Sequence, residues 1–128
     1  MSFACSSGGI TKSSLAGLFL NQRNSGAVAV VAASSFAHVY YTELFARGMM
    51  SGFFSDFDPA YPEAPLGRSF RVSEAMTHGK LYTRFWYGSN DNKADYLSRV
   101  FHYYGDPELQ LRTDTPVVPA ADIPGYIE

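Results

Sequence analysis

Cysteine is almost absent from this 128-residue chain, because Cys5 is the only one. A single cysteine excludes an internal disulfide framework and any zinc site built from several thiolates. The 10 Lys and Arg residues form no basic block and are offset by 12 Asp and Glu residues, so we expect neither nucleic acid nor an anionic membrane as a partner. The longest apolar run, Ala27 to Ala33, is far shorter than the roughly 20 residues of a membrane-spanning helix, so no membrane span is predicted.

The residues that are present favour a globular domain. Hydrophobic residues make up 46% of the chain and aromatic residues 16%, which is enough to bury a core. The length fits one domain of ordinary size. Periodicity and turn residues predict helices over about 14–21, 41–54, 68–85 and 93–103, and strands over 2–5, 26–33 and 108–112.

The order of these elements predicts an α/β fold, with a sheet covered by helices. Residues 26–33 do not alternate between apolar and polar, so we expect a strand buried on both faces, which is typical of a parallel sheet. Residues 114–128 contain three prolines and are predicted to be a linker or the start of a following domain. Each predicted helix has an apolar face expected to point to the core, and Gly79 is a weak point of the helix over 68–85. In chain order these faces are Leu15, Leu18 and Phe19; Leu44, Phe45, Met49 and Phe53; Phe70, Val72, Met76, Leu81 and Phe85; and Tyr96, Leu97, Val100 and Phe101.

Cys5 lies where an apolar segment gives way to small residues, Ser6-Ser7-Gly8-Gly9. This pattern predicts a side chain at the carboxyl end of a buried strand, where functional residues of open α/β sheets gather. A thiol near the start of the following helix can act as a nucleophile, and the N–H groups of Cys5 and the Ser6-Ser7 turn can help to hold an oxyanion. The alternative, which is the commonest for a lone cysteine, is a small buried apolar side chain.

Three blocks of sequence resemble the gingipain family of cysteine peptidases. They are Ala4-Cys5-Ser6-Ser7-Gly8, the segment GAVAVVAAS from Gly26 to Ser34, and the segment YGDPELQL from Tyr104 to Leu111. The blocks occur in the family's order, and the likeness covers about residues 3–113. The resemblance implies that Cys5 is the nucleophile of a peptidase whose substrates are peptides or proteins. It also implies a bacterial protein that is extracellular or at the cell surface.

The same resemblance implies a caspase-like fold, a three-layer sandwich with a mostly parallel sheet, here incomplete on its N-terminal side. In that fold the catalytic histidine ends the strand before the cysteine strand, which would lie upstream of Met1. We therefore expect residues 1–113 to be the later part of the catalytic domain, and the isolated chain to be inactive. The alternative is a non-catalytic structural remnant that needs a partner chain and associates through the unpaired sheet edge beside Cys5.

None of the three histidines fits the position of the catalytic base. His78-Gly79 imitates the family's His-Gly dipeptide but falls inside a predicted helix, where a surface or helix-packing role is the better interpretation. His102 falls in the last predicted helix, and we expect it to be structural or solvent-facing. His38 follows the strand that ends at Ser34-Ser35, and in the family this loop helps to wall the primary substrate pocket. Ser34, Ser35 and His38 are therefore the candidate pocket residues, against the alternative of ordinary strand-end polarity.

Two groups of oxygen-bearing side chains favour, at most, a structural calcium ion. Neither has the spacing of a twelve-residue calcium loop, and residues 89–92 more often cap the helix that follows. We therefore expect no cofactor and no catalytic metal. The candidate oxygen ligands are Asp56, Asp58, Asn90, Asp91, Asn92 and Asp95.

Overall fold

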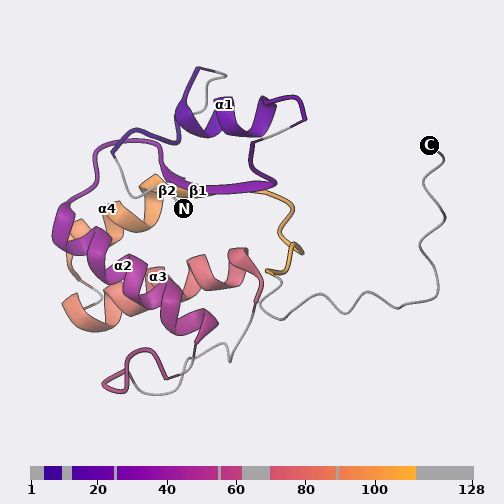
Figure 1. The fold of residues 1–128 in the computed structure, drawn as a ribbon. Coiled ribbons are helices and arrows are strands. Elements are labelled where there is room, and N and C mark those ends of the chain that lie inside the picture. The colour runs from indigo at the N-terminus through magenta and orange to yellow at the C-terminus, as the bar shows by residue number, and fades with distance from the viewer. Residues whose placement is uncertain are drawn as a thin grey trace, which may run out of the picture.

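The computed structural model describes residues 5–9, 13–24, 26–54, 56–61, 70–88 and 90–111 (Figure 1). Over these ranges the chain has a mixed α/β fold, with four helices and one two-stranded sheet. The predicted strand residues 2–4, the helix start at 68–69 and the linker 114–128 lie outside the described ranges. The elements are α1 (Leu15–Asn21), β1 (Ala29–Ala33), α2 (Val39–Phe53), α3 (Val72–Tyr87), α4 (Asn92–Val100) and β2 (Phe101–Gly105).

The two strands β1 and β2 are antiparallel, in a register that pairs Ala29 with Gly105 and Ala33 with Phe101. The predicted parallel sheet is therefore wrong for the described residues. The burial of β1 was predicted correctly, since Val31, Ala32 and Ala33 are at most 1% exposed. Burial on both faces reports which elements cover a strand, and it carries no information about the direction of the neighbouring strand.

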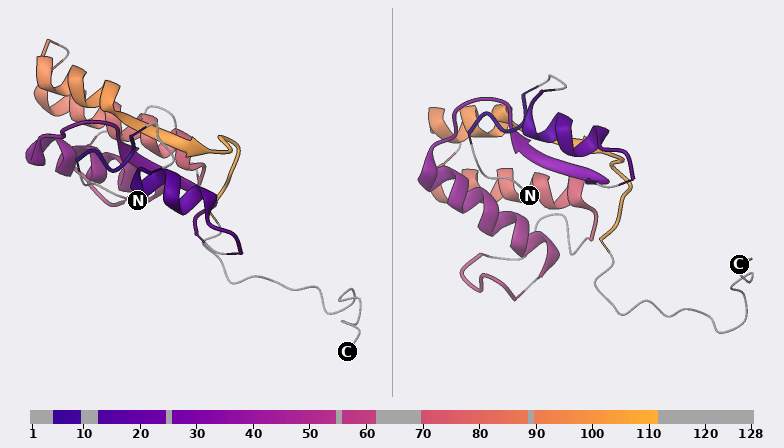
Figure 2. Two further views of the ribbon diagram at one scale, coloured as in Figure 1. Left: turned by 90° about the horizontal axis from the view of Figure 1, so that it is seen from above. Right: turned by 45° about the horizontal axis from the view of Figure 1, so that its top comes forward.

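The sheet is covered on both sides. Helix α1 lies on one side of β1, and α2 and α3 lie on the other (Figures 1 and 2). Side chains of a strand alternate between its faces, so Val31 and Ala33 join the core with α2 and α3. Ala32 faces the opposite side and contacts Gly8. The core consists of Val31, Ala33, Tyr41, Phe45, Met49, Phe53, Val72, Ala75, Ala94, Leu97, Val100 and Phe101.

Helix α4 ends at Val100, whereas the sequence predicted a helix to Tyr103. Asp91 caps its start by accepting the N–H groups of Lys93 and Ala94. The next residues, Phe-His-Tyr-Tyr, have aromatic side chains that favour a pleated surface, and they form β2. Helical spacing of Leu97, Val100 and Phe101 concealed this boundary, because a buried strand beginning directly after a helix continues its apolar pattern.

The strand predicted over 108–112 is also wrong for its described part, 108–111. The backbone there makes one isolated antiparallel bridge, between Gln110 and Arg71, and the N–H of Leu111 donates to the Phe70 carbonyl at 2.8 Å. The segment therefore packs beside the start of α3 and contributes no strand to the sheet. Alternation of apolar and polar residues is necessary for such a strand, but pairing with a neighbour decides whether it forms.

Helices α2 and α3 make the most extensive contact in the fold, and glycines allow their backbones to approach closely. A Cβ atom added to Gly79 would lie 2.6 Å from the Phe45 carbonyl oxygen, and one added to Gly48 would lie 2.4 Å from Tyr82 Cβ. Gly79, interpreted from the sequence as a weak point, is thus a packing contact. The inward face of α3 also differs from the prediction, because Leu81 and Phe85 are 36% and 51% exposed.

The helix predicted over 14–21 is confirmed as α1, and the Ser14 hydroxyl caps it by accepting the Gly17 N–H at 3.0 Å. Its expected apolar face does not enter the core. Leu18 is 56% exposed, and Leu15 and Phe19 are nearly as accessible, whereas Ala16 is buried. Ala16 is therefore the side chain through which α1 packs against the rest of the fold, and its N–H donates to the Ser7 carbonyl at 3.0 Å.

Candidate active site

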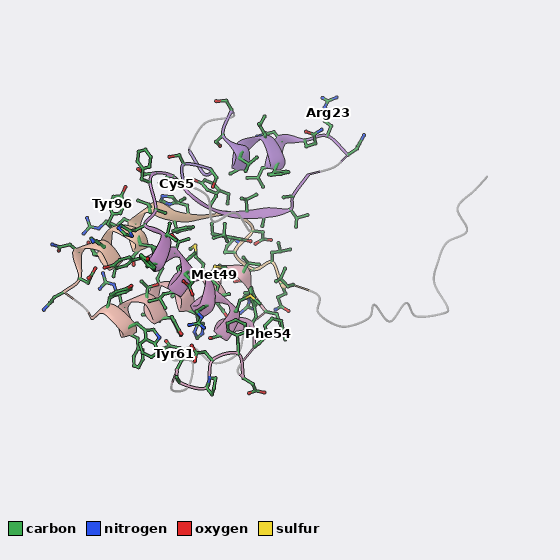
Figure 3. All side chains as sticks on the ribbon, turned by 60° about the vertical axis from the view of Figure 1, so that its left-hand side comes forward. Cys5, Arg23, Met49, Phe54, Tyr61 and Tyr96 are labelled. Atoms are coloured by element: carbon green, nitrogen blue, oxygen red, sulfur yellow. The ribbon has the colours of Figure 1, made fainter. Side chains whose placement is uncertain are left out.

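Cys5 lies in an exposed turn beside the carboxyl end of β1. The strand that the sequence predicted to end at Cys5 falls on residues 2–4, which lie outside the described residues. Its sulfur makes two hydrogen bonds, both to the backbone of Ala37. The Ala37 N–H donates to Sγ at 3.2 Å, and the thiol donates to the Ala37 carbonyl at 3.4 Å. Figure 3 shows Cys5 at the same end of the fold as Tyr96 and away from Phe54 and Tyr61. The sulfur is therefore accessible and is held by the loop that follows β1.

The turn after Cys5 is fastened to the end of β1. The Ser6 N–H donates to the Ser35 carbonyl at 3.0 Å, and the Gly8 N–H donates to the Ala33 carbonyl at 2.8 Å. The Tyr104 hydroxyl, from β2, donates to the Gly8 carbonyl. The turn approaches β1 so closely at Gly8 that a Cβ atom added there would lie 2.8 Å from the Cβ of Ala32, so this position requires glycine. Both strands of the sheet thus fix the position of Cys5.

The expected oxyanion donors are only partly available. The N–H of Ser6 is occupied by the Ser35 carbonyl, so it does not point at the sulfur. The N–H of Ala37 does point at the sulfur, and it comes from 32 residues further along the chain. Sequence reasoning missed Ala37 because its side chain carries no chemistry. Its role depends on a backbone contact between distant segments, for which no local signal exists.

A pocket of about 270 Å³ lies between the loop after β1 and helix α4. We call it the β1–α4 pocket. Ala37 lines it, so the residue that holds the sulfur also forms part of the pocket wall. A second, more open hollow of about 440 Å³ shares Ala37 and His38 and continues along Val39 and Tyr40. The residues lining the β1–α4 pocket are Phe36, Ala37, His38, Asn92, Lys93, Tyr96 and Leu97.

The structure places one of the three candidate pocket residues in the described lining of this pocket. His38 lines it directly. The Ser35 hydroxyl accepts a hydrogen bond from Tyr96 at 3.1 Å and so holds one of the lining side chains. The Ser34 hydroxyl donates to the Val100 carbonyl at 3.2 Å and lies 3.0 Å from His102 Nε2, which can donate to it. Ser34 and Ser35 therefore connect the loop to β2 and α4.

The three histidines lie in different parts of the fold and have different surroundings. His38 is exposed at the start of α2, where its ring lies 5.6 Å from that of Tyr41 in an edge-on arrangement. His78 is fully buried between α2 and α3, which makes it a helix-packing residue. His102 lies in β2 and not in a helix, which corrects its predicted position. Within the described part of the chain, the hydrogen bonds of the Cys5 sulfur go to Ala37 and to none of these rings.

The acidic side chains proposed for calcium have other partners in the fold. Asp58 accepts a hydrogen bond from Tyr82, which is the main reason that the pKa of Asp58 lies below its ordinary value. Asp95 forms ion pairs with Arg84 and Arg99, each at 2.7 Å. Among the residues that the structure describes, no group of three or more His, Cys, Asp or Glu side chains is arranged to hold a metal ion.

Asp91 connects α4 to α2 near the β1–α4 pocket. Its carboxylate accepts the N–H groups of Ala94 and Lys93, each at 2.8 Å, and the hydroxyl of Tyr41 at 3.1 Å. The Ala94 N–H is the main cause that lowers the pKa of Asp91, and the Tyr41 hydroxyl adds to it. Burial raises the pKa of Tyr41, and its bond to Asp91 raises it further. The anionic form of Asp91 is therefore the form that the fold stabilises.

One comparison with known proteins gives a match. The model of peptidase family C25 matches residues 1–112. The search of curated proteins and the search of solved structures each found no significant match. None of the helices in the described ranges is long and apolar enough to cross a membrane. The family match covers most of the chain, so the chain belongs to peptidase family C25, the gingipain-type cysteine peptidases.

Proposed function

We propose that Cys5 is the nucleophile of this member of peptidase family C25, and that the domain cleaves peptide or protein substrates. The observation that carries the proposal is the position of the sulfur. It is exposed at the carboxyl end of β1, bound to the Ala37 backbone, and next to a pocket that Ala37 also lines. A nucleophile beside a pocket that can take a substrate side chain is the arrangement that acyl transfer needs.

In the proposed reaction the Cys5 sulfur attacks the carbonyl carbon of the scissile peptide. A C–S bond forms as the carbonyl π electrons move to oxygen, and the tetrahedral oxyanion then collapses, breaking the C–N bond. The Ala37 N–H, which now donates to the sulfur at 3.2 Å, is the described donor best placed to turn toward that oxygen. A general base takes the thiol proton and, once protonated, gives a proton to the departing amine; water then hydrolyses the thioester.

The proton for the amine comes from a general acid, most often histidine. Since the sulfur contacts Ala37 and no imidazole, we propose that the catalytic histidine lies outside these 128 residues. Residues 1–113 would then form the later part of a caspase-like, three-layer catalytic domain, followed by a linker. The location that we propose is extracellular or at the surface of a bacterial cell, in keeping with family C25.

The second candidate function is a structural remnant that completes its fold with another chain. The sheet supports it, because in the described residues β1 has one neighbouring strand, β2. On the opposite edge, in the part of the chain that the structure describes, the Gly8 N–H donates to the Ala33 carbonyl at the end of β1, and the Ser6 N–H donates to Ser35 just beyond it. An incompletely paired edge is a place where another strand can add. Under this proposal the sheet edge is the interaction surface, and Cys5 has no catalytic task.

Peptidase assays on two proteins separate these proposals. The first protein is the 128-residue chain, which we expect to cleave no peptide. The second is the whole gene product that contains it, which we expect to cleave a mixed peptide library and to lose this activity on the change Cys5→Ala. Full activity of the Cys5→Ala variant would contradict the peptidase role of Cys5. Absence of activity in the whole gene product, together with dimer formation by the chain, would favour the remnant.

A further inference from the structure

We propose that Tyr41, at the start of α2, is a positioning residue for the sulfur of Cys5. It fixes the second end of the loop after β1, and through that loop it fixes the Ala37 backbone to which the sulfur is bound. This inference rests on the proposed peptidase function and names a residue that acts on the nucleophile through the fold. It is carried by the contacts of the Tyr41 side chain.

The loop that holds the sulfur is fixed at its first end by β2. The N–H of Ser34, the residue directly after β1, donates to the Val100 carbonyl at 2.8 Å. The next large apolar side chains give the loop little support, because Phe36 and Val39 are 77% and 75% exposed. Tyr41, 7% exposed, is the first buried side chain after β1. The second end of the loop is therefore fixed where Tyr41 enters the fold.

Two contacts hold the Tyr41 side chain in place. Its hydroxyl donates to the Asp91 carboxylate at 3.1 Å, and a charged acceptor makes such a bond stronger than one between neutral groups. Its ring stacks on the Tyr87 ring, with centroids 4.1 Å apart and planes 15° from parallel. Asp91 caps the start of α4, and Tyr87 ends α3. Tyr41 therefore binds the start of α2 to the junction between α3 and α4.

Tyr41 is connected to Ala37 through His38. The His38 ring lies edge-on to the Tyr41 ring, with centroids 5.6 Å apart. The His38 carbonyl accepts the N–H and the hydroxyl of Thr42, each at 2.9 Å. Ala37 directly precedes His38, and its N–H and carbonyl bind the Cys5 sulfur. A displacement of Tyr41 is therefore passed to the sulfur over a short stretch of hydrogen-bonded backbone.

The alternative role of Tyr41 is packing alone. Packing needs only the ring, which phenylalanine also supplies, and a buried tyrosine hydroxyl usually finds a hydrogen-bond partner wherever it lies. Loss of the hydroxyl would then lower the stability of the whole fold without singling out any part of it. In the positioning role, the same loss loosens Ala37 more than it loosens the far end of α2.

Tyr82→Phe is the matched control for Tyr41→Phe. The Tyr82 hydroxyl also donates to an aspartate, Asp58, and the Tyr82 side chain is also buried. Its ring lies 4.8 Å from that of Tyr61, which Figure 3 shows away from Cys5. Both changes remove one hydrogen bond between a tyrosine and an aspartate, but only Tyr41→Phe removes it next to the loop that holds the sulfur.

Amide hydrogen exchange in the 128-residue chain, followed by NMR, tests the positioning role without any need for turnover. The quantity to measure is the exchange rate of the Ala37 N–H divided by that of the Phe54 N–H, which donates to the Met50 carbonyl at the far end of α2. In Tyr41→Phe this ratio should rise about fivefold, the effect of losing one hydrogen bond of ordinary strength. In Tyr82→Phe it should keep the parent value. Circular dichroism would confirm that each variant is folded.

A double-mutant cycle tests whether Asp91 is the partner that matters. Asp91→Ser keeps an oxygen that can cap α4 but lacks the second oxygen that reaches Tyr41. This change should also raise the exchange ratio. Adding it to Tyr41→Phe should raise the ratio little further, because both changes remove the same bond. Fully additive effects would contradict the role of the Tyr41–Asp91 bond.

The kcat of the whole gene product gives a second readout. A sulfur that is held less firmly is less often placed for attack, so kcat should fall about tenfold in Tyr41→Phe. It should be unchanged in Tyr82→Phe at a temperature where both variants are folded. A merely structural role of Tyr41 would affect the two variants alike.

Several results would overturn the inference. They are an unchanged exchange ratio in Tyr41→Phe, an equal rise in Tyr82→Phe, or an unchanged kcat of Tyr41→Phe in a gene product that loses cleavage on the change Cys5→Ala. The proposed function has its separate readout in Cys5→Ala. Loss of cleavage in that variant with unchanged Ala37 exchange would support the function and reject the positioning role. A raised Ala37 ratio with full cleavage by Cys5→Ala would support the link from Tyr41 to the sulfur and reject the function.

Discussion

The backbone of Ala37 holds the sulfur of Cys5 through two hydrogen bonds, with the Ala37 N–H donating to Sγ at 3.2 Å and the Ala37 carbonyl accepting at 3.4 Å. The contact joins two segments that lie on either side of α1 and β1 in the sequence. It places the only thiol of the chain beside the β1–α4 pocket. The loop after β1 thus serves both as the support of the nucleophile and as the wall of the pocket.

Gly8→Ala should destabilise the turn that carries Cys5. The new methyl group would lie 2.8 Å from Ala32 Cβ and 2.9 Å from the backbone of Ala32, which β1 holds in place. Overpacking of this kind typically costs about 1–3 kcal/mol in the free energy of unfolding, measurable by urea denaturation. Gly9→Ala is the matched control, because its nearest contact would be an ordinary 3.7 Å. Equal stability of the two variants would show that the turn does not approach β1 as described.

Gly79→Ala should lower stability although alanine is the better helix former. Helix propensity alone would favour the change by about 1 kcal/mol. The added Cβ would meet the Phe45 carbonyl oxygen at 2.6 Å, and backbone atoms cannot move aside cheaply. We expect the clash to outweigh propensity and lower the free energy of unfolding by about 1 kcal/mol or more. Thr77→Ala, on the exposed face of the same helix, should be within about 0.5 kcal/mol of the parent protein. A stabilised Gly79→Ala variant would argue against the α2–α3 contact.

The two serines after β1 should respond differently to replacement by alanine. Ser34→Ala removes the hydroxyl that joins Val100 to His102, a half-buried link that we expect to contribute about 1 kcal/mol. Ser35→Ala removes an exposed bond to Tyr96 and should change stability by less than about 0.5 kcal/mol. A larger loss of stability in Ser35→Ala than in Ser34→Ala, measured by urea denaturation, would contradict the assigned positions.

Asp91 should contribute stability that is lost in acid. Its folded pKa lies below the ordinary 3.8, so its anion favours the folded state. Such a group contributes fully above its unfolded pKa, and the contribution disappears as pH falls through the lower folded value. Asp91→Asn keeps a helix-capping side chain without a charge. The melting temperature of the parent protein should exceed that of Asp91→Asn at pH 6, and the difference should shrink as pH falls below 3.8. A difference that is independent of pH would contradict the assigned role of the charge.

Local sequence patterns predicted much of the fold. The apolar, non-alternating run that becomes β1 and the helical spacing of α2 are read directly from neighbouring residues. The direction of the β2 pairing could not be predicted, because hydrogen bonds between distant strands set it. The boundary at Val100 was hidden for a related reason, since β2 prolongs the apolar pattern of α4.

The candidate site also has a part that the local sequence predicts and a part that it does not. His38 follows the end of a strand in the sequence, and the structure places it in the pocket lining. Lys93 and Tyr96 join it only because α4 packs beside the loop after β1, and that packing depends on contacts between segments far apart in the chain. Ala37 acts through its backbone, which carries the same atoms as any other residue except proline. Residues of this kind become visible only when the fold is known.

The most direct test of the account compares the alkylation of Cys5 in the folded chain with that in the chain unfolded by urea. The quantity to measure is the rate with a peptidyl chloromethyl ketone that ends in phenylalanine, divided by the rate with chloroacetamide, which has no side chain to place in the pocket. Both rates are read from the mass of the Cys5 peptide. If the sulfur lies beside a pocket that binds the side chain, this ratio should be about tenfold or more higher in the folded chain. The same ratio in both states would contradict the account, because Cys5 would then react as an ordinary exposed thiol.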